Sequence, residues 1–340
     1  MKKYILILVL FVSGVLNAQN FKTPNDYLTY VGNETDALSN SIWQYTSAIA
    51  HSRSVSYLDQ QRLNLLNDCK NITRKVKGLT NGYNGDVEYK NQLLDYFTLI
   101  ESEINTEYKK ATEIQNGLKS FEEIEKYTLE RSLANNIIKE QIDKLNVYQK
   151  VFADKYQIKI TENDSPVGVK MKISNEVFKY HSRFYLIFLK INMAESNLID
   201  AISKNDLAAT EKNLEVLRTA NSYGYSKLKL IEAYKDDKTL LEKTQTFLDF
   251  TKKEIAEFGD AAVNYLKIKK NFDVQKELLE KKINLSDKER EDYNNAAQEK
   301  NFSFKAYARI NDYYNAEREK IIKDWNLTGD KFIDAYVPAN

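Results

Sequence analysis

The stretch KITENDSPVGVKMKIS (residues 159–174) holds Pro166, which, apart from one proline near each end, is the only proline in the chain. On both sides of it, apolar residues recur three and four apart, which is the periodicity of amphipathic helices. Pro166 removes a backbone donor and Gly168 relaxes the chain, so we expect one helix to end here before Ser174 caps the next. Parts of the stretch also alternate apolar and polar residues, which leaves a short extended passage as a second interpretation. The sequence therefore predicts a linker at residues 158–173 between two helical halves.

The composition favours long helices. The 340 residues include only three Pro and ten Gly, and both residue types interrupt helices. The chain is long enough for one large domain or two smaller ones, each with its own core. Its 23 Tyr suit partly wet helix interfaces, where the ring packs and the hydroxyl reaches water. These features predict an all-α fold.

Two capping boxes mark helix starts, one in each half. They are SFEE (residues 120–123) and SDKE (residues 286–289), in which a Ser and a Glu three residues later satisfy each other's backbone N–H groups. Similar start and stop signals recur at intervals that give each half about four helices. We predict two tandem antiparallel helical bundles, over residues 19–157 and 174–340.

The two halves resemble each other when the sequence is shifted by 151 positions without gaps. A turn in each half falls in register, because Tyr83 then lies on Tyr234 and Asp86 on Asp237. The same shift pairs seven further positions: Leu63 with Leu214, Leu66 with Leu217, Leu79 with Leu230, Glu103 with Glu254, Ile104 with Ile255, Ala111 with Ala262 and Phe121 with Phe272. Helical sequences share their periodicity by chance, so a fortuitous match stays open beside an internal duplication.

The N-terminus, MKKYILILVLFVSGVLNAQN (residues 1–20), has the layout of a secretory signal peptide. A basic start precedes an apolar run, and the small residue Ala18 then offers a cleavage site, so we predict a signal peptide over residues 1–18. A retained membrane anchor is the alternative, but the apolar run is short for a bilayer span. Beyond it, the longest apolar run, residues 184–191, is too short to cross a membrane. We therefore expect an exported protein of the periplasm, the cell surface or the extracellular space, without a transmembrane span after cleavage.

The charge balance bears on the kind of partner. Lys and Arg number 50 against 49 Asp and Glu, so no basic excess is available to hold a phosphate backbone, and we expect no binding to nucleic acid. Long amphipathic helices with exposed tyrosines suit contact with another protein, and peripheral association with the envelope is compatible with them.

Few residues are candidates for chemistry. Neither His51 nor His181 has a partner at metal-binding spacing, so both are expected at helix surfaces or interfaces. Cys69 is the single cysteine, which excludes an internal disulfide, and it lies on an apolar stripe as a small buried hydrophobe would. NGYNGD (residues 81–86) offers oxygen ligands to calcium but lacks the later acidic residue of a calcium loop. The sequence assigns no catalytic, cofactor-binding or metal-binding residue and no cofactor.

The leader ending in NAQN (residues 17–20), the Asn, Lys and Tyr bias and the unbroken helices resemble a broad group of exported proteins of Bacteroidetes. They are also similar to helical surface proteins predicted in spirochaetes. This resemblance implies an exported all-helical protein and carries no activity or site residue. Imelysin-like iron-uptake proteins also consist of duplicated helical bundles, but neither His51 nor His181 lies in their G-x-H-x-x-E motif.

Three functional hypotheses follow. The first is a non-enzymatic exported protein, a pair of helical bundles acting as a binding or structural module for a protein partner. The alternative is a small-ligand or metal-ion binder with a pocket between helices or between the bundles. The third, an enzyme, requires buried acidic residues with raised pKa values that converge in a cleft.

Overall fold

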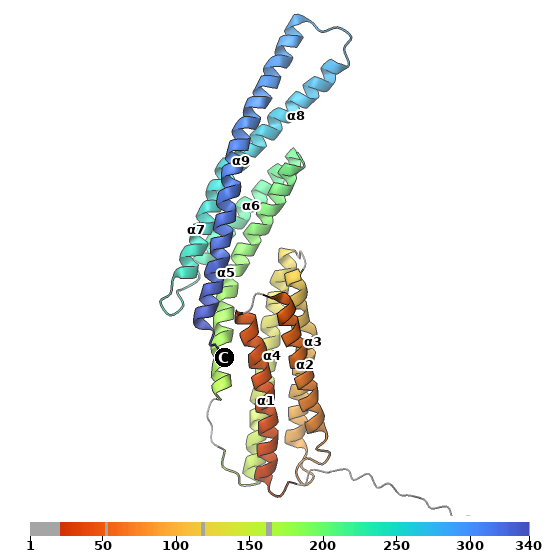
Figure 1. The fold of residues 1–340 in the computed structure, drawn as a ribbon, viewed down its shortest axis with the longest axis vertical. Coiled ribbons are helices and arrows are strands. Elements are labelled where there is room, and N and C mark those ends of the chain that lie inside the picture. Colours follow the sequence, from red (N-terminus) through yellow and green to blue (C-terminus); the bar gives the residue numbers. More distant parts are fainter. Residues whose placement is uncertain (1–20, 52–53, 117–119, 161–164, 340) are drawn as a thin grey trace, which may run out of the picture. The chain divides into compact units, whose positions relative to one another are not determined.

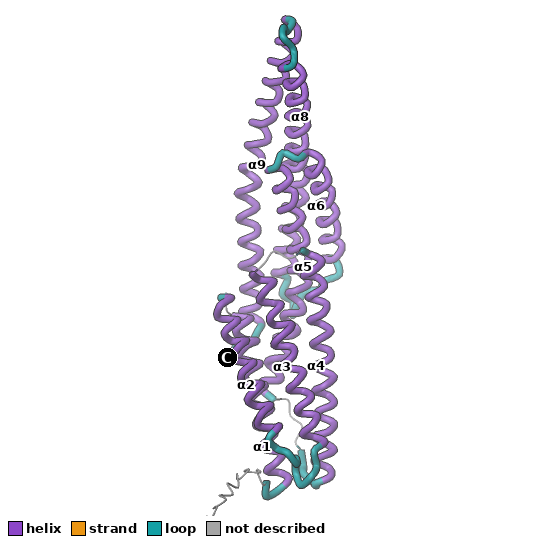
Figure 2. Tube along the Cα trace, turned by 90° about the vertical axis from the view of Figure 1, so that its right-hand side faces the viewer, coloured by secondary structure: helices purple, strands orange, loops and turns teal. Residues whose placement is uncertain are grey.

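The protein's structure, a computed structural model, consists of helices joined by short loops (Figures 1 and 2). It describes residues 21–51, 54–116, 120–160 and 165–339, so the predicted signal peptide (residues 1–18) lies outside the described part. Within those ranges no strand is present, and the predicted all-α fold is confirmed. Tertiary contacts divide the chain into two compact units, with residues 49–52 and 118–127 grouped with the second.

Apart from the end of α1 and the first two turns of α4, which group with unit 2, unit 1 is built from four helices, α1 (Pro24–His51), α2 (Val55–Lys77), α3 (Glu88–Asn116) and α4 (Phe121–Lys155). Each helix turns an apolar stripe inward, since side chains three and four apart share a face. The fully buried side chains of this core include Tyr27, Leu65, Leu93, Phe97 and Ile104.

Unit 2 contains α5 (Pro166–Ser203), α6 (Leu207–Leu228), α7 (Thr239–Glu254), the π-helix η1 (Ile255–Gly259), α8 (Asp260–Glu280) and α9 (Asp287–Tyr336). The segments α7, η1 and α8 follow one another without a break, and α9 packs along all three. The outer parts of α8 and α9 continue as a two-helix projection past α5 and α6 (Figure 1). We call this projection, residues 267–305, the arm; Phe272 and Ser303 are its only buried residues.

The start of α5 differs from the sequence prediction. The helix begins at Pro166, not at Ser174, so the alternating residues 167–173 are helical, whereas residues 158–160, which also alternate in polarity, form neither helix nor strand. Ser174 is buried inside the helix, where its hydroxyl donates to the carbonyl oxygen of Lys170 at 2.8 Å. Proline ends a preceding helix but suits the first position of a new one, where its missing N–H would have no partner in any case. The expected linker therefore loses its second half to α5, and its residues 161–164 lie outside the described part.

Both predicted capping boxes are confirmed. In α4, the N–H of Glu123 donates to Ser120 Oγ at 3.2 Å and the N–H of Ser120 to Glu123 Oε2 at 2.9 Å. In α9, the corresponding distances between Glu289 and Ser286 are 3.3 and 2.9 Å.

The predicted turns before α3 and α7 have the same backbone geometry. In unit 1, Tyr83 and Asp86 exchange backbone hydrogen bonds of 3.1 and 2.9 Å, and the two residues between them have φ angles of 49° and 88°. In unit 2, Tyr234 and Asp237 exchange bonds of 3.2 and 2.9 Å across residues with φ angles of 49° and 68°. Two consecutive positive φ angles are typical of a type I′ turn.

Each turn tyrosine packs into a cluster of four aromatic rings. In unit 1 these are Tyr27, Tyr83, Phe152 and Tyr156, and in unit 2 they are Tyr180, Tyr234, Phe332 and Tyr336. The last two rings of each cluster are four residues apart, at the end of α9 in unit 2 and across the end of α4 in unit 1, where Tyr156 directly follows the helix. Their centroids are 4.7 Å apart in unit 1 and 4.8 Å apart in unit 2. In unit 2 the final tyrosine, Tyr336, donates its hydroxyl to Asp237 Oδ2 at 3.1 Å, and in unit 1 burial and the nearby Asp86 carboxylate raise the pKa of the final tyrosine, Tyr156.

The ungapped shift is wrong for the second helix of each unit. Leu63 is 38% exposed although its partner Leu214 is buried, and Leu79 is buried although its partner Leu230 is 69% exposed. The buried residue that precedes the turn in unit 2 is Ile231, because the loop there is one residue shorter. The pairing of Phe121 with Phe272 fails as well, since the first begins α4 and the second lies late in α8.

Candidate functional site

The most unusual side-chain arrangement in unit 2 is a buried ionic cluster, which we call the Glu–Arg–Glu cluster. It joins Glu195 of α5, Glu254 at the end of α7 and Arg318 of α9, which are 3%, 1% and 8% exposed. The Arg318 Nε donates to Glu195 Oε1 at 2.7 Å, and a second guanidinium nitrogen donates to Glu254 Oε1. A third nitrogen donates to Asn315 Oδ1 at 2.6 Å. One cation thus bridges two carboxyl groups from two other helices.

The helices place these side chains on their inward stripes. Glu195 lies four residues after the buried Ile191 and three before the buried Leu198. Glu254 immediately precedes η1, whose wider backbone brings Gly259 against α6, so that a Cβ at Gly259 would lie 2.4 Å from Leu214 Cδ1. Short π-helical segments inside α-helices occur frequently at functional sites.

The electrostatics favour a proton on this cluster. Burial raises the pKa of Glu254 to about 10, and the neighbouring carboxyl group of Glu195 adds to the rise, although Arg318 opposes it. Burial also disfavours the charge of Arg318, but the two carboxyl groups outweigh this effect and raise the pKa of Arg318. Arg318 therefore stays charged while Glu254 favours its neutral form.

This cluster is not among the sites predicted from the sequence. Glu254 was considered only as the position paired with Glu103, and Glu195 and Arg318 were not singled out. A signal was available, since an acidic residue on a buried apolar stripe needs a partner from another helix. The partner could not be identified from sequence, because Arg318 lies 64 residues beyond Glu254.

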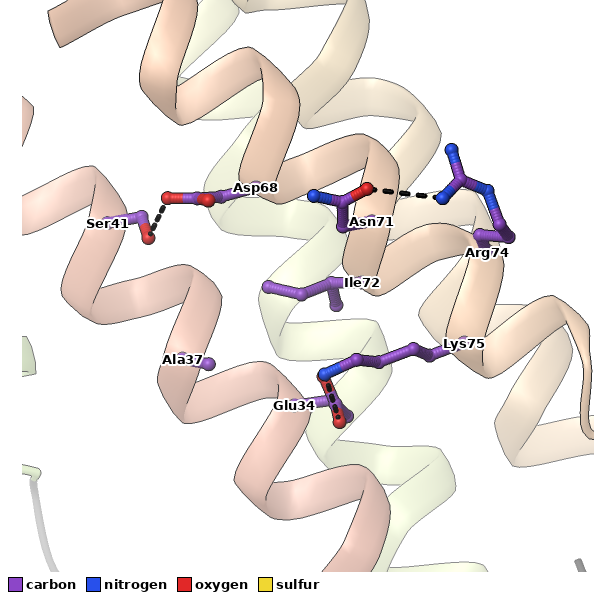
Figure 3. A pocket seen from close by; sticks show the side chains of 8 residues that line it. All are labelled: Glu34, Ala37, Ser41, Asp68, Asn71, Ile72, Arg74 and Lys75. Atoms are coloured by element: carbon purple, nitrogen blue, oxygen red, sulfur yellow. Dashed lines mark hydrogen bonds and ion pairs between the residues drawn. The ribbon is translucent and has the colours of Figure 1, made fainter.

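A groove in unit 1 between α1 and α2 has a volume of about 640 Å³ and is shown in Figure 3. Its polar side chains pair with one another. Lys75 Nζ lies 2.9 Å from both carboxylate oxygens of Glu34, and Ser41 Oγ donates to Asp68 Oδ2 at 2.8 Å. The groove therefore offers a ligand few polar groups that are not already engaged.

A second groove, in unit 2 between α6 and α8, has a volume of about 430 Å³. Its charges also pair across it, with Lys267 Nζ 2.8 Å from Glu211 Oε1 and an Arg218 nitrogen 3.9 Å from Asp260 Oδ1. Neither groove is lined by the Glu–Arg–Glu cluster.

The residues considered from sequence lie apart from the cluster. Cys69 is fully buried, as predicted; its Sγ donates to the Phe97 carbonyl oxygen at 3.5 Å, and burial raises the pKa of the thiol to about 11. His51 is the last residue of α1, whereas His181, on α5, lies with its ring centroid 6.2 Å from that of Trp325. In the described part of the chain, no three His, Cys, Asp or Glu side chains converge as a metal site would require.

Comparison with protein-family models, curated proteins and solved structures found no match to this chain. None of the described helices combines the length and the apolar character that a membrane span requires.

Proposed function

We propose that the protein is an exported, non-enzymatic binding module of the cell envelope or surface, and that the arm of unit 2 holds a protein partner. The observation that carries this proposal is the exposure of large apolar side chains along the arm. Val274 and Leu278 on α8 are 53% and 60% exposed, Ile283 in the loop is 99% exposed, and Phe302 on α9 is 77% exposed. Exposed apolar patches of this kind typically mark interaction surfaces.

The charges of the arm favour a protein partner over a polyanion or an anionic membrane surface. Residues 267–305 carry ten Lys and Arg against eight Asp and Glu, and many of these pair along one helix. Lys269 Nζ lies 2.8 Å from Asp273 Oδ2, and Lys281 Nζ lies 2.8 Å from Glu277 Oε1. Such self-paired charges attract little counter-charge, whereas the exposed apolar side chains of α8, α9 and the loop between them fit an apolar groove or helix of another protein.

The test compares recovery of an envelope protein by the wild-type chain and by an arm variant, Val274→Ser/Leu278→Ser/Phe302→Ser. The proposal predicts that a partner recovered by the wild type is lost by the arm variant, while its circular dichroism and thermal unfolding stay as in the wild type. These side chains bury little surface in the unit, so the fold should tolerate the change.

A matched control carries the same number of polar substitutions elsewhere. Leu129, Leu133 and Ile137 on α4 are 62%, 54% and 52% exposed, so their replacement by serine removes similar apolar surface from unit 1. The control variant should keep the partner. Equal recovery by the arm variant and the wild type would contradict the proposal, as would equal losses in both variants.

The export part of the proposal rests on the N-terminal residues 1–18 and is tested separately. Mass spectrometry of the protein from envelope or secreted fractions should give a mature chain that begins at Gln19. A chain that retains residues 1–18 in those fractions would contradict cleavage.

We also propose that the two units are copies of one ancestral four-helix unit and that the arm is the later addition. The shared turn and the four-ring clusters support this proposal, since helical periodicity alone would not reproduce them. Ile104 and Phe152 of unit 1 are 48 positions apart, whereas Ile255 and Phe332 of unit 2 are 77 apart, and the additional length accounts for most of the arm. Superposition of experimentally determined units should align the eight cluster rings pairwise; rings that do not superpose would contradict the duplication.

The alternative function, a small-ligand or metal-ion binder, would use the groove between α1 and α2. Its volume suits a small molecule, but its charged groups engage one another, so it ranks second. Native mass spectrometry of the purified protein distinguishes the two, because a stoichiometric bound mass would favour the alternative.

A further inference from the structure

The Glu–Arg–Glu cluster lies outside the arm. If all three of its groups were ionised, it would carry a net charge of minus one. It contains two carboxyl groups and one guanidinium group, all of them buried. Glu254 Oε2 is fully buried and has no hydrogen-bonding partner among the described residues. One oxygen of Glu195 and one of Glu254 accept from the same guanidinium group of Arg318, so the two carboxyl groups lie close together, where two ionised carboxylates would repel each other.

No second cation completes the cluster among the described side chains around it. On α9, Tyr314 donates its hydroxyl to Glu257 Oε2 at 2.7 Å, and burial raises the pKa of Tyr307, so that its phenol stays neutral. The charged side chains of α6 and α8 near η1 pair with each other: Arg218, Glu215 and Asp260. Two ionised carboxylates with one arginine would therefore leave one uncompensated negative charge in the core, which is costly.

We propose that the Glu–Arg–Glu cluster is a proton-binding site, in which the carboxyl groups of Glu195 and Glu254 share one proton at neutral pH. With that proton the cluster is neutral and joins α5 and α7 to α9. When the proton leaves for solvent, the O–H bond of one carboxyl group breaks, its electron pair stays on the carboxylate, and the cluster becomes negative by one charge. Alkaline solution therefore loosens α9 from α7 and η1.

The cluster is not required by a four-helix unit of this kind. In the register of the two ring clusters and turns, the positions of Glu195, Glu254 and Arg318 correspond in unit 1 to Ile42, Glu103 and Ile138. Unit 1 thus forms its bundle with isoleucine at two of the three positions. The fold of such a unit therefore does not itself require the buried charges of unit 2. This is what we expect if these charges have a specific role.

Infrared spectroscopy of the full chain at neutral pH tests for the proton directly. The wild type should show the C=O stretching band of a protonated, buried carboxyl group, and this band should be absent from Glu254→Gln. The glutamine amide donates to Glu195 and its oxygen accepts from Arg318, so the variant needs no proton to be neutral. A wild-type spectrum without the band at neutral pH would overturn the proposal.

Unfolding as a function of pH supplies a second readout. The chain has two tryptophans, Trp43 in unit 1 and Trp325 in unit 2, so a Trp43→Phe background makes fluorescence report on unit 2. Folded Glu254 keeps its proton above the ordinary glutamate pKa of about 4.3 while the unfolded chain releases it. The folding equilibrium constant of unit 2 should therefore fall by up to about tenfold per pH unit between pH 6 and pH 9.

The matched variants separate this effect from other titrations. Glu254→Gln should lose the slope, whereas Glu257→Gln, which changes an exposed carboxyl group on η1, should keep it. Identical slopes in the wild type and Glu254→Gln would overturn the proposal. Should Glu254→Gln fail to fold, the infrared band of the wild type still decides the question.

Discussion

Replacement of Arg318 by methionine should destabilise unit 2 strongly. Methionine keeps most of the length and volume of the side chain but removes the donors to Glu195 and Glu254. The two carboxyl groups, 3% and 1% exposed, then share the core without a cation. Removal of one partner from a buried ionic group costs about 3–5 kcal/mol, because the remaining charge stays buried and unpaired.

The assay is urea unfolding at pH 7.5 of the full chain in the Trp43→Phe background. Trp325 is the reporter, because it is 3% exposed and stacks on Phe188 with ring centroids 4.0 Å apart. With a slope of about 2 kcal/mol per molar urea, the expected loss moves the unfolding midpoint of unit 2 down by about 2 M. The slope itself should stay the same, since the surface exposed on unfolding is unchanged.

The pH dependence has a definite sign. The pKa of Glu254 already lies above its ordinary range, and the loss of Arg318 removes the one group that opposes the rise. A folded pKa above the unfolded value gives stability that is complete at low pH and declines as the pH rises. The destabilisation by Arg318→Met should therefore be largest above pH 7 and should shrink toward pH 5.

A second substitution tests whether the unpaired carboxyl groups cause this loss of stability. The double variant Arg318→Met/Glu195→Ile replaces Glu195 by isoleucine, the residue type found at the matching position, Ile42, of unit 1. It leaves only the carboxyl group of Glu254, which can stay neutral by keeping its proton. It should recover more than half of the lost stability. A loss below about 1 kcal/mol for Arg318→Met alone would refute the reasoning, because that value is typical of a water-exposed ion pair.

Three further predictions concern packing, reactivity and a helix cap. Gly224→Ala should destabilise unit 2 by about 1–3 kcal/mol in thermal or urea unfolding, since a Cβ there would lie 2.5 Å from Leu248 Cδ2; a stabilised variant would contradict this packing. Cys69 should react with a thiol reagent only after unfolding, because burial raises the pKa of its thiol to about 11; a fast reaction of the native protein would show that the core around it is open. Ser286→Ala should cost α9 about 1 kcal/mol of local stability, measured as faster amide hydrogen exchange in its first turn, while exchange at the start of α4 stays unchanged.

Local signals in the sequence predicted local structure well. The two capping boxes and the turns before α3 and α7 depend on residues within a few positions of one another, so their patterns predict them directly. The start of α5 was predicted eight residues too late, because Pro166 was interpreted only as a helix breaker although it also suits the first helical turn.

Features that depend on contacts distant in sequence could not be predicted. The ungapped shift wrongly paired the buried Leu79 with the exposed Leu230. The hydrophobic pattern of a helix does not show that the loop after it is one residue shorter. The Glu–Arg–Glu cluster depends on which turns of α5, α7 and α9 face one another. That register follows from the packing of the whole unit rather than from any local motif.

The central claim, that the arm binds a protein partner in the envelope, is tested most directly by photo-crosslinking in growing cells. A photoreactive amino acid placed at Ile283, which is 99% exposed, or at Phe302 should give an adduct of one defined mass. The same amino acid at Tyr57 on α2 of unit 1, which is 49% exposed, should give none. Absence of adducts at both arm positions, or the same adduct at Tyr57, would contradict the account.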